Sequence, residues 1–538
     1  MPLTKVHNRM IQGQLLNPID FGAAADGTTD DTAAIQAAFS AAQPYDGIVF
    51  PAGVYKTNGA ITLNTNDVTI DFQGATLRVG DTGTSGSFVL NSVTYTGKIG
   101  FLFDRCDRLK ILGSVTMLGQ GTVGTTSLTG VVFSDCDDLS AEAHMHFDTM
   151  ASGRTVMNCN RPFLGNAYGN KMDGKQTFES PPSSNAGSVE VLVGCYYGRS
   201  GDIVSFDAEK PARYMSVGAG RSNTGMTIGA STAEYDGASI TSHALAIRSA
   251  VDCTFGPVTS IGGNHGALQI QQYSGDNAAG YVVSRIYIEA VLGVTGPTGA
   301  SVDSLVYCDT TDSVAIGEVS IGSVNGSCSG EFGIFLTCGE LRINHVSVTG
   351  NANQMVLVSP TSSSGFDPEL YVTHFDLGVF GGVNQPITIG KGGYFQCDTL
   401  NVSSGPTNAI TIAVYYNPSL GDGSYHNGIH IGSIRYDQSG STNNYQYLVY
   451  DASTTAGPAS VSVYNVISSN ASGEDLILNT GGYYARSGKL MSAAAPTSGT
   501  WRVNDQVWDV TPNSGAQMGW VCRVAGNPGT WVAMPNFA

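Results

Sequence analysis

Short apolar segments recur along most of this chain, and their spacing limits the folds that the chain can adopt. They run from Ala60–Leu63 and Phe101–Phe103 to Ile387–Ile389 and Ile410–Ile412, and a second apolar segment follows many of them. The repeat is about 20–35 residues long, and one such unit is too small to bury its own apolar face. The pattern therefore predicts a solenoid of stacked coils.

An all-β sandwich is the structural alternative, but it would show shorter, more even spacing and fewer recurring corner residues. Asn325, Asn353 and Asn384 recur where coils would close, and asparagine tolerates the left-handed backbone of a tight corner. Cys106 and Cys136 each follow an apolar strand at the same position. We therefore expect the cysteines to be stacked, reduced core residues rather than disulfides or zinc ligands.

The stretch 31–43 predicts a short amphipathic helix. Its apolar residues recur at helical spacing, at Ile35, Ala38, Phe39 and Ala42. Asp30 or Asp31 can accept the N–H groups of the first turn, and Pro44 ends the helix. A single helix before a long β-rich chain suits a cap over the open end of the stack, where strand edges would otherwise be unpaired.

The same region carries a motif. It reads D-F-G-A from Asp20, D-G-x-x-D-D-T-x-A-I-Q-x-A from Asp26 and F-P-x-G-x-Y from Phe50. This pattern resembles the N-terminal cap of the pectate-lyase-like superfamily of right-handed parallel β-helices, in particular its bacteriophage tailspikes and capsule depolymerases. The resemblance covers about forty residues and is more specific for the fold than for the chemistry. It implies an all-β, right-handed parallel β-helix and a homotrimer.

The expected layout has three parts. An N-terminal leader spans 1–18, a parallel β-helix with its cap helix near 31–43 spans 19–490, and a small Trp-rich β module spans 491–538. All four tryptophans lie in this last part, after the linker-like segment Ala493–Pro496. They either form the core of a small unit or stack on sugar rings. The leader is expected to contact a virion tail or adaptor protein, or to be a partly ordered arm.

The composition of the chain limits the classes of partner that it is expected to bind. The formal net charge of −18 argues against nucleic acid and anionic membranes. No apolar run approaches the length of a membrane span, and Met1–Gln14 lacks the apolar core of a signal peptide. We therefore expect a virion protein that is released by lysis and acts extracellularly at the bacterial surface.

Polar residues between about 199 and 276 line adjacent coils when the apolar segments are aligned. One outward column contains Ser205, Thr227, Ala246 and Gln269, and the next contains Asp207, Gly229, Arg248 and Gln271. A groove along a polymer needs many hydrogen-bonding groups together with a pair of carboxylates. This alignment predicts such a groove.

The predicted acid/base pair is Asp207 and Asp236, with Glu209 and Glu234 as substitutes. Asp207 and Glu209 lie about one coil before Glu234 and Asp236 in the sequence. The alternative for each carboxylate is a solvated or turn-capping role. The predicted sugar-binding residues are Arg221, Arg248, His265, Gln269 and Tyr273. No metal or other cofactor is expected, since zinc, Walker and EF-hand motifs are absent from the sequence.

These features predict a tailspike that binds and cleaves a bacterial surface polysaccharide, capsule or O-antigen, as an endo-glycoside hydrolase. A polysaccharide lyase is the first alternative, with Lys210 or Tyr214 as the base and Arg248 or Arg221 neutralising a uronate. A non-catalytic receptor-binding fibre is the second. A bacterial cell-wall enzyme is disfavoured by the missing signal peptide.

Overall fold

The structure of the protein is a computed structural model with two compact units, Met1–Val294 (unit 1) and Thr295–Ala538 (unit 2). Each unit is described by itself. The residues that the structure describes are 13–80, 85–90, 93–120, 128–172, 188–207, 211–218, 220–235, 243–261, 266–272, 281–295, 304–310, 316–328, 332–350, 354–360, 367–379, 385–404, 412–417, 419–420, 428–437, 447–451, 460–468, 477–479, 484–486, 489–492, 494–497, 503–504, 506–509, 517–525 and 529–535.

Unit 1 is a stack of coils in which each coil contributes one strand to each of three parallel sheets. The first sheet contains β5 (Ile61–Leu63), β9 (Val93–Asp104), β12 (Leu128–Ser134), β15 (Ser152–Met157), β18 (Glu190–Val193), β21 (Arg213–Ser216), β25 (Leu245–Ile247) and β29 (Leu268–Gln272). β8 (Ser85–Leu90) pairs antiparallel with the start of β9. We call each strand of a sheet a rung.

The second and third sheets follow the first along every coil. The second contains β1 (Leu15–Leu16), β3 (Gly47–Val49), β6 (Thr69–Asp71), β10 (Lys110–Leu112), β13 (Ser140–Ala141), β16 (Phe163–Leu164), β19 (Arg199–Ser200), β23 (Thr227–Ile228) and β27 (Thr254–Phe255). The third contains β2 (Asp26–Asp30), β4 (Val54–Thr57), β7 (Ala75–Val79), β11 (Ser114–Gly119), β14 (His144–Asp148), β17 (Ala167–Asn170), β20 (Ile203–Phe206), β24 (Ser231–Glu234) and β28 (Val258–Ile261). β31 (Ile286–Thr295) pairs with both β27 and β28. β22 (Asn223–Thr224), β26 (Ala250–Val251) and β30 (Val283–Ser284) form a short corner sheet.

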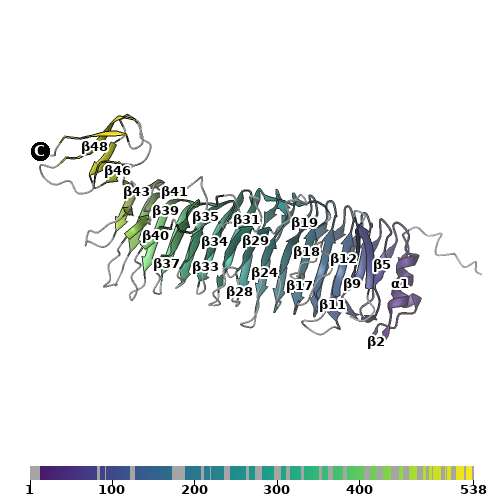
Figure 1. Cartoon of the computed structure of the whole chain (residues 1–538). Helices are drawn as coiled ribbons and strands as arrows, with labels where there is room; N and C mark the ends of the chain where they lie inside the picture. The colour runs from purple at the N-terminus through teal and green to yellow at the C-terminus, as the bar shows by residue number, and fades with distance from the viewer. Residues whose placement is uncertain are drawn as a thin grey trace, which may run out of the picture. The chain divides into compact units, whose positions relative to one another are not determined.

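The predicted cap helix is present as α1 (Thr32–Ala41), after the short 3-10 helix η2 (Pro18–Phe21), and lies at the N-terminal end of the unit 1 stack (Figure 1). The Phe39 ring lies 5.9 Å from Phe101 and 6.3 Å from Phe103, so α1 closes the interior of the first coils. Asp30 accepts a hydrogen bond from the Thr32 N–H at 3.1 Å. Asp31 does not cap the helix; its carboxylate accepts N–H groups from residues 24 and 25 instead.

Parallel pairing between strands one coil apart confirms the predicted parallel β-helix and excludes a sandwich. Phe101 lies beside Val131, and Phe103 lies beside Phe133 with the two rings stacked at 5.2 Å. Alternate residues of a strand point to opposite faces, so each inward column forms a ladder through the core.

The expected thiol stack is also present. The Cys106 N–H donates to Cys136 Sγ at 3.4 Å, and the Cys136 N–H donates to Cys159 Sγ at 3.3 Å. All ten cysteines are buried and none forms a disulfide. The corner prediction for Asn325 is wrong, because Asn325 lies inside a strand; Asn353 and Asn384 lie outside the described residues.

Asn223 takes the corner role in unit 1. Its side-chain oxygen accepts the Cys195 N–H at 2.9 Å, and its amide donates to backbone carbonyls of Leu192, Ser216 and Ser249. The buried amide thus satisfies backbone groups that the turn leaves without partners.

A charged cluster interrupts the apolar interior of unit 1. Arg154, Glu190 and Arg213 occupy neighbouring rungs of one inward column, and their side chains are fully buried. Glu190 accepts from Arg154 Nε at 2.8 Å and from Arg213 Nε at 2.6 Å. Burial acts to raise the pKa of Glu190, but the two guanidinium groups outweigh it and the pKa lies below its ordinary value. The charges are retained in the core only because each has a partner.

In unit 2 each coil contributes two strands, because the second strand is long enough to replace two. The first strands are β32 (Val306–Thr310), β34 (Ile334–Leu336), β36 (Val356–Val358), β38 (Ile387–Gly390), β40 (Ile412–Asn417), β42 (Tyr447–Asp451) and β44 (Ile477–Asn479). The long strands are β33 (Val319–Cys328), β35 (Glu340–Gly350), β37 (Glu369–Val379), β39 (Tyr394–Ser404), β41 (Gly428–Asp437) and β43 (Ser460–Ser468), followed by the shorter β45 (Tyr484–Arg486).

Pairing changes near the predicted boundary at 490. β46 (Lys489–Ser492) pairs antiparallel with β45, and β48 (Gly519–Val524) pairs antiparallel with both β47 (Gln506–Asp509) and β49 (Thr530–Ala533). Trp520 packs with Val507 and Cys522 in a small core. This supports the core interpretation for Trp520, while the predicted domain boundary stays a prediction.

No helix among the described residues is long and apolar enough to cross a membrane.

Candidate active site

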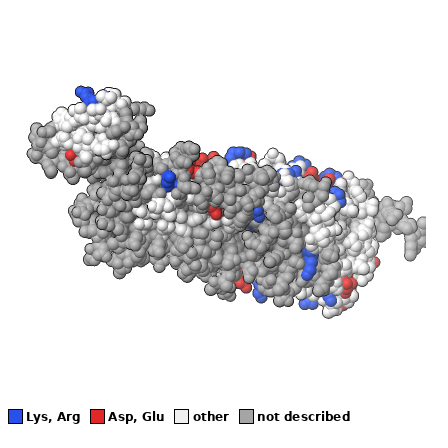
Figure 2. Space-filling view, viewed as in Figure 1, with Lys and Arg blue, Asp and Glu red and all other residues white. Residues whose placement is uncertain are grey.

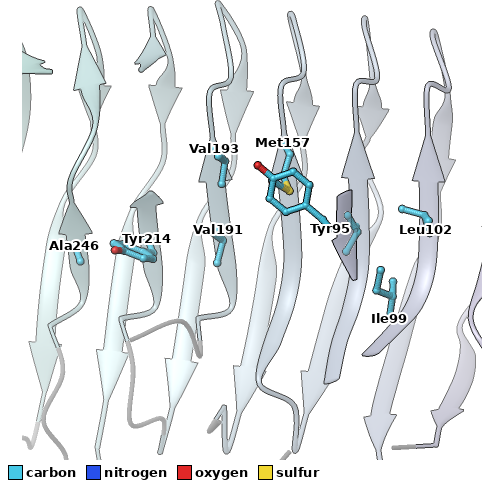
Figure 3. Close-up of a cluster of buried hydrophobic side chains, with 9 residues drawn as sticks. Tyr95, Ile99, Leu102, Met157, Val191, Val193, Tyr214 and Ala246 are labelled. Atoms are coloured by element: carbon cyan, nitrogen blue, oxygen red, sulfur yellow. The ribbon is translucent and has the colours of Figure 1, made fainter. Parts of the chain in front are cut away.

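The outer face of the first sheet in unit 1 changes from apolar to polar along the stack. At β9, β12, β15 and β18 its residues include Leu102, Val132, Met157 and Val191, which form a buried cluster with Tyr95 (Figure 3). The same cluster ends at Tyr214 on β21 and Ala246 on β25. This apolar part is covered and therefore offers no ligand site in the described residues.

Polar side chains follow at the last three rungs of this sheet. Arg248 Nη1 donates to Tyr214 Oη at 3.2 Å, and Gln269 Nε2 donates to Gln271 Oε1 at 3.0 Å. Arg248 is 5% exposed, so its guanidinium is held largely out of water. We call Tyr214, Arg248, Gln269 and Gln271 the Arg248 cluster. It supplies donors suited to carboxylates or hydroxyl groups.

Two of the four residues predicted to share the first outward column do so. Ala246 and Gln269 are register partners on β25 and β29. Ser205 instead lies beside Ala233 in the third sheet, and Thr227 lies beside Arg199 and Thr254 in the second. The alignment was wrong there because segments that close a coil are as apolar as segments that open one.

Glu234 is the last residue of β24, and Asp207 directly follows β20, the neighbouring rung of the third sheet. Glu234 is the register partner of Phe206, and the Asp207 N–H donates to the Glu234 carbonyl at 2.8 Å. Asp207 has the positive φ of 51°, which turns the chain out of β20 toward the next coil. Both side chains are partly exposed, so both can reach a ligand on this face.

A phenol and a third carboxylate lie on the two rungs that precede this pair. Burial and the negative charges of Glu234 and Asp148 raise the pKa of Tyr168, which therefore stays protonated. The Tyr168 and His146 rings meet edge to face at 4.6 Å, and Asn170 donates to Asp148 at 2.8 Å. His146 Nε2 is buried with no hydrogen-bond partner among the described residues.

The sequence analysis missed these neighbours because the carboxylates in 199–276 were compared only with one another. His146 and Asp148 alternate with buried Met145 and Phe147, and Tyr168 and Asn170 repeat that alternation on the next rung. Aligning the closing strands of the coils, in addition to the opening ones, would have placed all four on the two rungs that precede β20.

Arg221 does not join either group. Its guanidinium donates to the backbone carbonyls of Gly194 at 3.1 Å and Asn158 at 3.2 Å, and it stacks 3.7 Å above the Tyr196 ring. Burial lowers its pKa. Through these contacts Arg221 stabilises the corner after the first sheet. Its predicted role in sugar binding stays a prediction.

Several predicted residues lie outside the described part of the chain: Glu209, Asp236, His265 and Tyr273, together with Lys210. Within the described part, no group of three or more His, Cys, Asp or Glu could hold a metal ion. Figure 2 shows the described acidic and basic residues of one face in small separate groups.

Residues 16–176 match the family described as rhamnogalacturonase A/epimerase, pectate lyase-like. The segment includes α1 and the strands that carry His146, Asp148 and Tyr168. This match confirms the resemblance to pectate-lyase-like proteins for that segment. No curated protein matches the chain.

Solved structures with likeness to this chain include a family 28 exopolygalacturonase from Yersinia enterocolitica, at 12% identity and a TM-score of 0.36, covering 88% of this chain and 78% of that one. ORF18 of Geobacillus virus E2 matches at 14% identity and a TM-score of 0.28, with 69% and 62% covered. The Streptococcus pneumoniae adhesin PfbA matches at 10% identity and a TM-score of 0.34, with 88% and 100% covered. Sequence identities and TM-scores this low do not support an inference about activity.

Proposed function

We propose that this protein is an endo-acting glycoside hydrolase that depolymerises a bacterial surface polysaccharide. The observation that carries the proposal is that Asp207 directly follows β20 while Glu234 ends the neighbouring strand β24, and that both side chains are partly exposed. Glycoside hydrolysis needs two carboxyl groups on either side of the scissile bond, one to protonate the leaving oxygen and one to attack or to activate water.

We propose the retaining mechanism, because the two carboxylates come from adjacent coils. Adjacent rungs are about 4.8 Å apart, and retaining glycosidases hold their carboxyl groups about 5–5.5 Å apart. In this arrangement one carboxylate forms a glycosyl ester while the other protonates the leaving oxygen and then deprotonates the attacking water. Asp236 and Glu209 remain the alternative partners.

Tyr168 is proposed to orient the substrate. Its phenol stays protonated beside Glu234, so it can donate a hydrogen bond to a sugar hydroxyl or to the carboxylate. The edge-to-face contact with the His146 ring helps to hold the Tyr168 ring in place. Donors fixed before the substrate binds lower the cost of organising it.

The biological setting is part of the proposal. The cap motif from Asp20 to Tyr55 resembles that of tailspikes, and residues 16–176 match a pectate-lyase-like family. We propose a homotrimeric virion protein whose N-terminal leader binds the tail or an adaptor protein and which acts outside the cell. The formal charge of −18 disfavours nucleic acid and membrane as partners.

A polysaccharide lyase is the second candidate, favoured by the Tyr214–Arg248 contact at 3.2 Å. In β-elimination the arginine would neutralise a uronate carboxylate, and the neighbouring phenolate would remove the C5 proton as the glycosidic bond breaks. That reaction needs an acidic polysaccharide.

The test is incubation of the protein with purified polysaccharides from a panel of bacterial strains, followed by mass analysis of the fragments. A hydrolase adds one water per cleaved bond, whereas a lyase leaves an unsaturated, ultraviolet-absorbing end. Under the proposal Asp207→Asn and Glu234→Gln lower the rate roughly 10²–10⁴-fold. Asp252→Asn, at a surface ion pair with Arg285, serves as the matched control and cleaves like wild type.

The alternatives give different results. Unchanged cleavage by intact Asp207→Asn, Glu234→Gln and Asp236→Asn proteins would refute the carboxylate site. Unsaturated products that disappear in Tyr214→Phe would establish the lyase. Binding of a polysaccharide without any shortening would establish a receptor-binding fibre.

A further inference from the structure

The long strands of unit 2 carry a row of aromatic and acidic side chains on their outer face. One column of register contains Arg342, Tyr371, Gln396 and His430, and the neighbouring column contains Glu340, Glu369, Tyr394 and Gly428. The residues between the columns, such as Leu370 and Phe395, are buried. Alternation along the strand therefore points both columns outward.

Three rings lie side by side on β37, β39 and β41. The centroids of Tyr371 and Tyr394 are 5.4 Å apart, and those of Tyr394 and His430 are also 5.4 Å apart. The Arg342 guanidinium lies 4.4 Å above the Tyr371 ring. We call Tyr371, Tyr394 and His430 the tyrosine platform. Its rings follow the stacking direction of the coils, which is the direction in which a polymer can run.

Gly428 makes room for the centre of the tyrosine platform. A Cβ atom at Gly428 would lie 2.9 Å from Tyr394 Cδ2 and 3.1 Å from His430 Nε2. The Tyr394 ring thus covers the backbone of the neighbouring strand. Because Tyr394 is only partly buried, part of its side chain remains accessible to a ligand.

Polar groups frame the rings. Tyr371 donates to Glu369 Oε2 at 2.7 Å, and Tyr394 donates to Gln396 Oε1 at 3.1 Å. These bonds fix the rings, and the carboxylate and the amide keep further capacity to accept and donate hydrogen bonds. A pyranose presents an apolar C–H face to an aromatic ring and hydroxyl groups around its edge, which matches this arrangement.

The charges around the tyrosine platform limit the class of glycan that it can bind. Glu340 and Glu369 are register partners on β35 and β37, and Glu318 directly precedes β33. The guanidinium of Arg342 contacts Glu318 and Glu340. Three carboxylates against one guanidinium leave an excess of negative charge. A glycan that carries uronate or phosphate groups would be repelled.

We propose that the tyrosine platform binds a polysaccharide that lacks acidic groups, by stacking its pyranose rings on Tyr371 and Tyr394. It is a second glycan-binding surface that holds polymer without cleaving it. The inference rests on the proposed function only in taking a glycan as the ligand. Occupation by a second copy of the chain is the competing outcome.

The experiment measures binding of the full chain to an array of bacterial polysaccharides grouped as neutral, amino-sugar-containing and uronate-containing. Tyr371→Ala and Tyr394→Ala are each expected to weaken binding to the first two groups about three- to tenfold. Gly428→Ala, which displaces the Tyr394 ring but keeps every polar group, should weaken it as well. Tyr464→Ala is the matched control, since Tyr464 is exposed on the same sheet in a different column.

Size-exclusion chromatography and thermal unfolding accompany each variant. Equal binding by wild type and both tyrosine variants, or binding to uronate glycans alone, would overturn the inference. So would a change of oligomeric state in the tyrosine variants, because the face would then be a subunit contact. Platform-dependent binding without any cleavage would refute the proposed hydrolase and leave this inference standing. Cleavage with platform-independent binding would do the reverse.

Discussion

The Arg248 cluster of unit 1 and the tyrosine platform of unit 2 are both built from the outward residues of parallel strands, yet they differ on both sides of the sheet. The Arg248 cluster offers a guanidinium and amides, and the inward column of its sheet includes the buried charges of Glu190 and Arg213. The platform offers phenols and carboxylates, and its inward neighbours are apolar, as at Leu370.

The comparison shows that the two faces of a rung are chosen separately. Tyr214 and Arg213 are adjacent in the sequence, but they point to opposite faces of the sheet, and only Arg213 joins the charged interior. The ladder only requires that each inward residue suit its neighbours on the rungs above and below. Chemistry on the outer face can therefore vary while the fold is kept, and the interiors are expected to differ in their response to substitution.

The largest expected effect comes from the charged interior. Glu190→Gln removes the carboxylate that pairs two buried guanidinium groups, and it should destabilise the protein by about 3–5 kcal/mol. The measurement is the midpoint of thermal unfolding, with Asp252→Asn as a control at an exposed pair. A shift no larger than that of the control would remove the proposed contrast between the interiors.

The stability of the apolar interior should depend on the volume of its side chains and not on their charge. Leu370→Ala, behind the tyrosine platform, should cost about 2–4 kcal/mol through lost burial and a cavity. The loss should be the same at all pH values at which the protein is folded, because no titrating group is removed. A strongly pH-dependent loss would contradict the distinction drawn from the inward columns.

The two regions should also lose stability in different pH windows. The Glu190 pKa lies below its ordinary value of 4.5, so its contribution is present above 4.5 and is lost as the pH falls through the folded-state value. Burial lowers the pKa of His430 from 6.5, so protonation of the unfolded chain removes stability as the pH falls below 6.5. His430→Gln should remove the loss of stability below pH 6.5 and leave the loss below pH 4.5 unchanged. The measurement is the midpoint of unfolding as a function of pH. Unchanged curves would contradict this assignment.

The smallest loss of stability is expected on the outer face of the first sheet in unit 1. Tyr214→Phe removes one hydrogen bond to Arg248 and should cost about 1 kcal/mol. For a hydrolase that uses Asp207 and Glu234, cleavage by this variant should stay near the wild-type rate. A large loss of cleavage would instead move the site to the Arg248 cluster.

The features predicted correctly from the sequence are mainly those that the local pattern repeats. The helical spacing of Ile35, Ala38 and Phe39 predicted α1, and the recurrence of Cys106 and Cys136 predicted the thiol stack. Such features depend on a residue and its neighbours within one coil, which the sequence displays directly.

The candidate site was less accessible to the same reasoning. Asp207 and Arg248 were predicted to share a column, but they follow strands of different sheets. Opening and closing strands look alike in composition, so the sequence does not show which sheet each strand joins. The grouping of Tyr168 with Glu234 joins residues from different coils. The charged triad was not predicted either, because an Arg or Glu in a strand is read as exposed unless its partners are known.

By itself the sequence determined that short strands repeat, that a helix precedes them and that the coils must stack to bury their apolar faces. Only the tertiary structure decided which side chains from successive coils become neighbours, and hence where carboxylates, guanidinium groups and aromatic rings collect. The reason is that stacking partners lie a whole coil apart in the chain, and coil lengths vary with the loops, so register is fixed by three-dimensional packing rather than by counting residues.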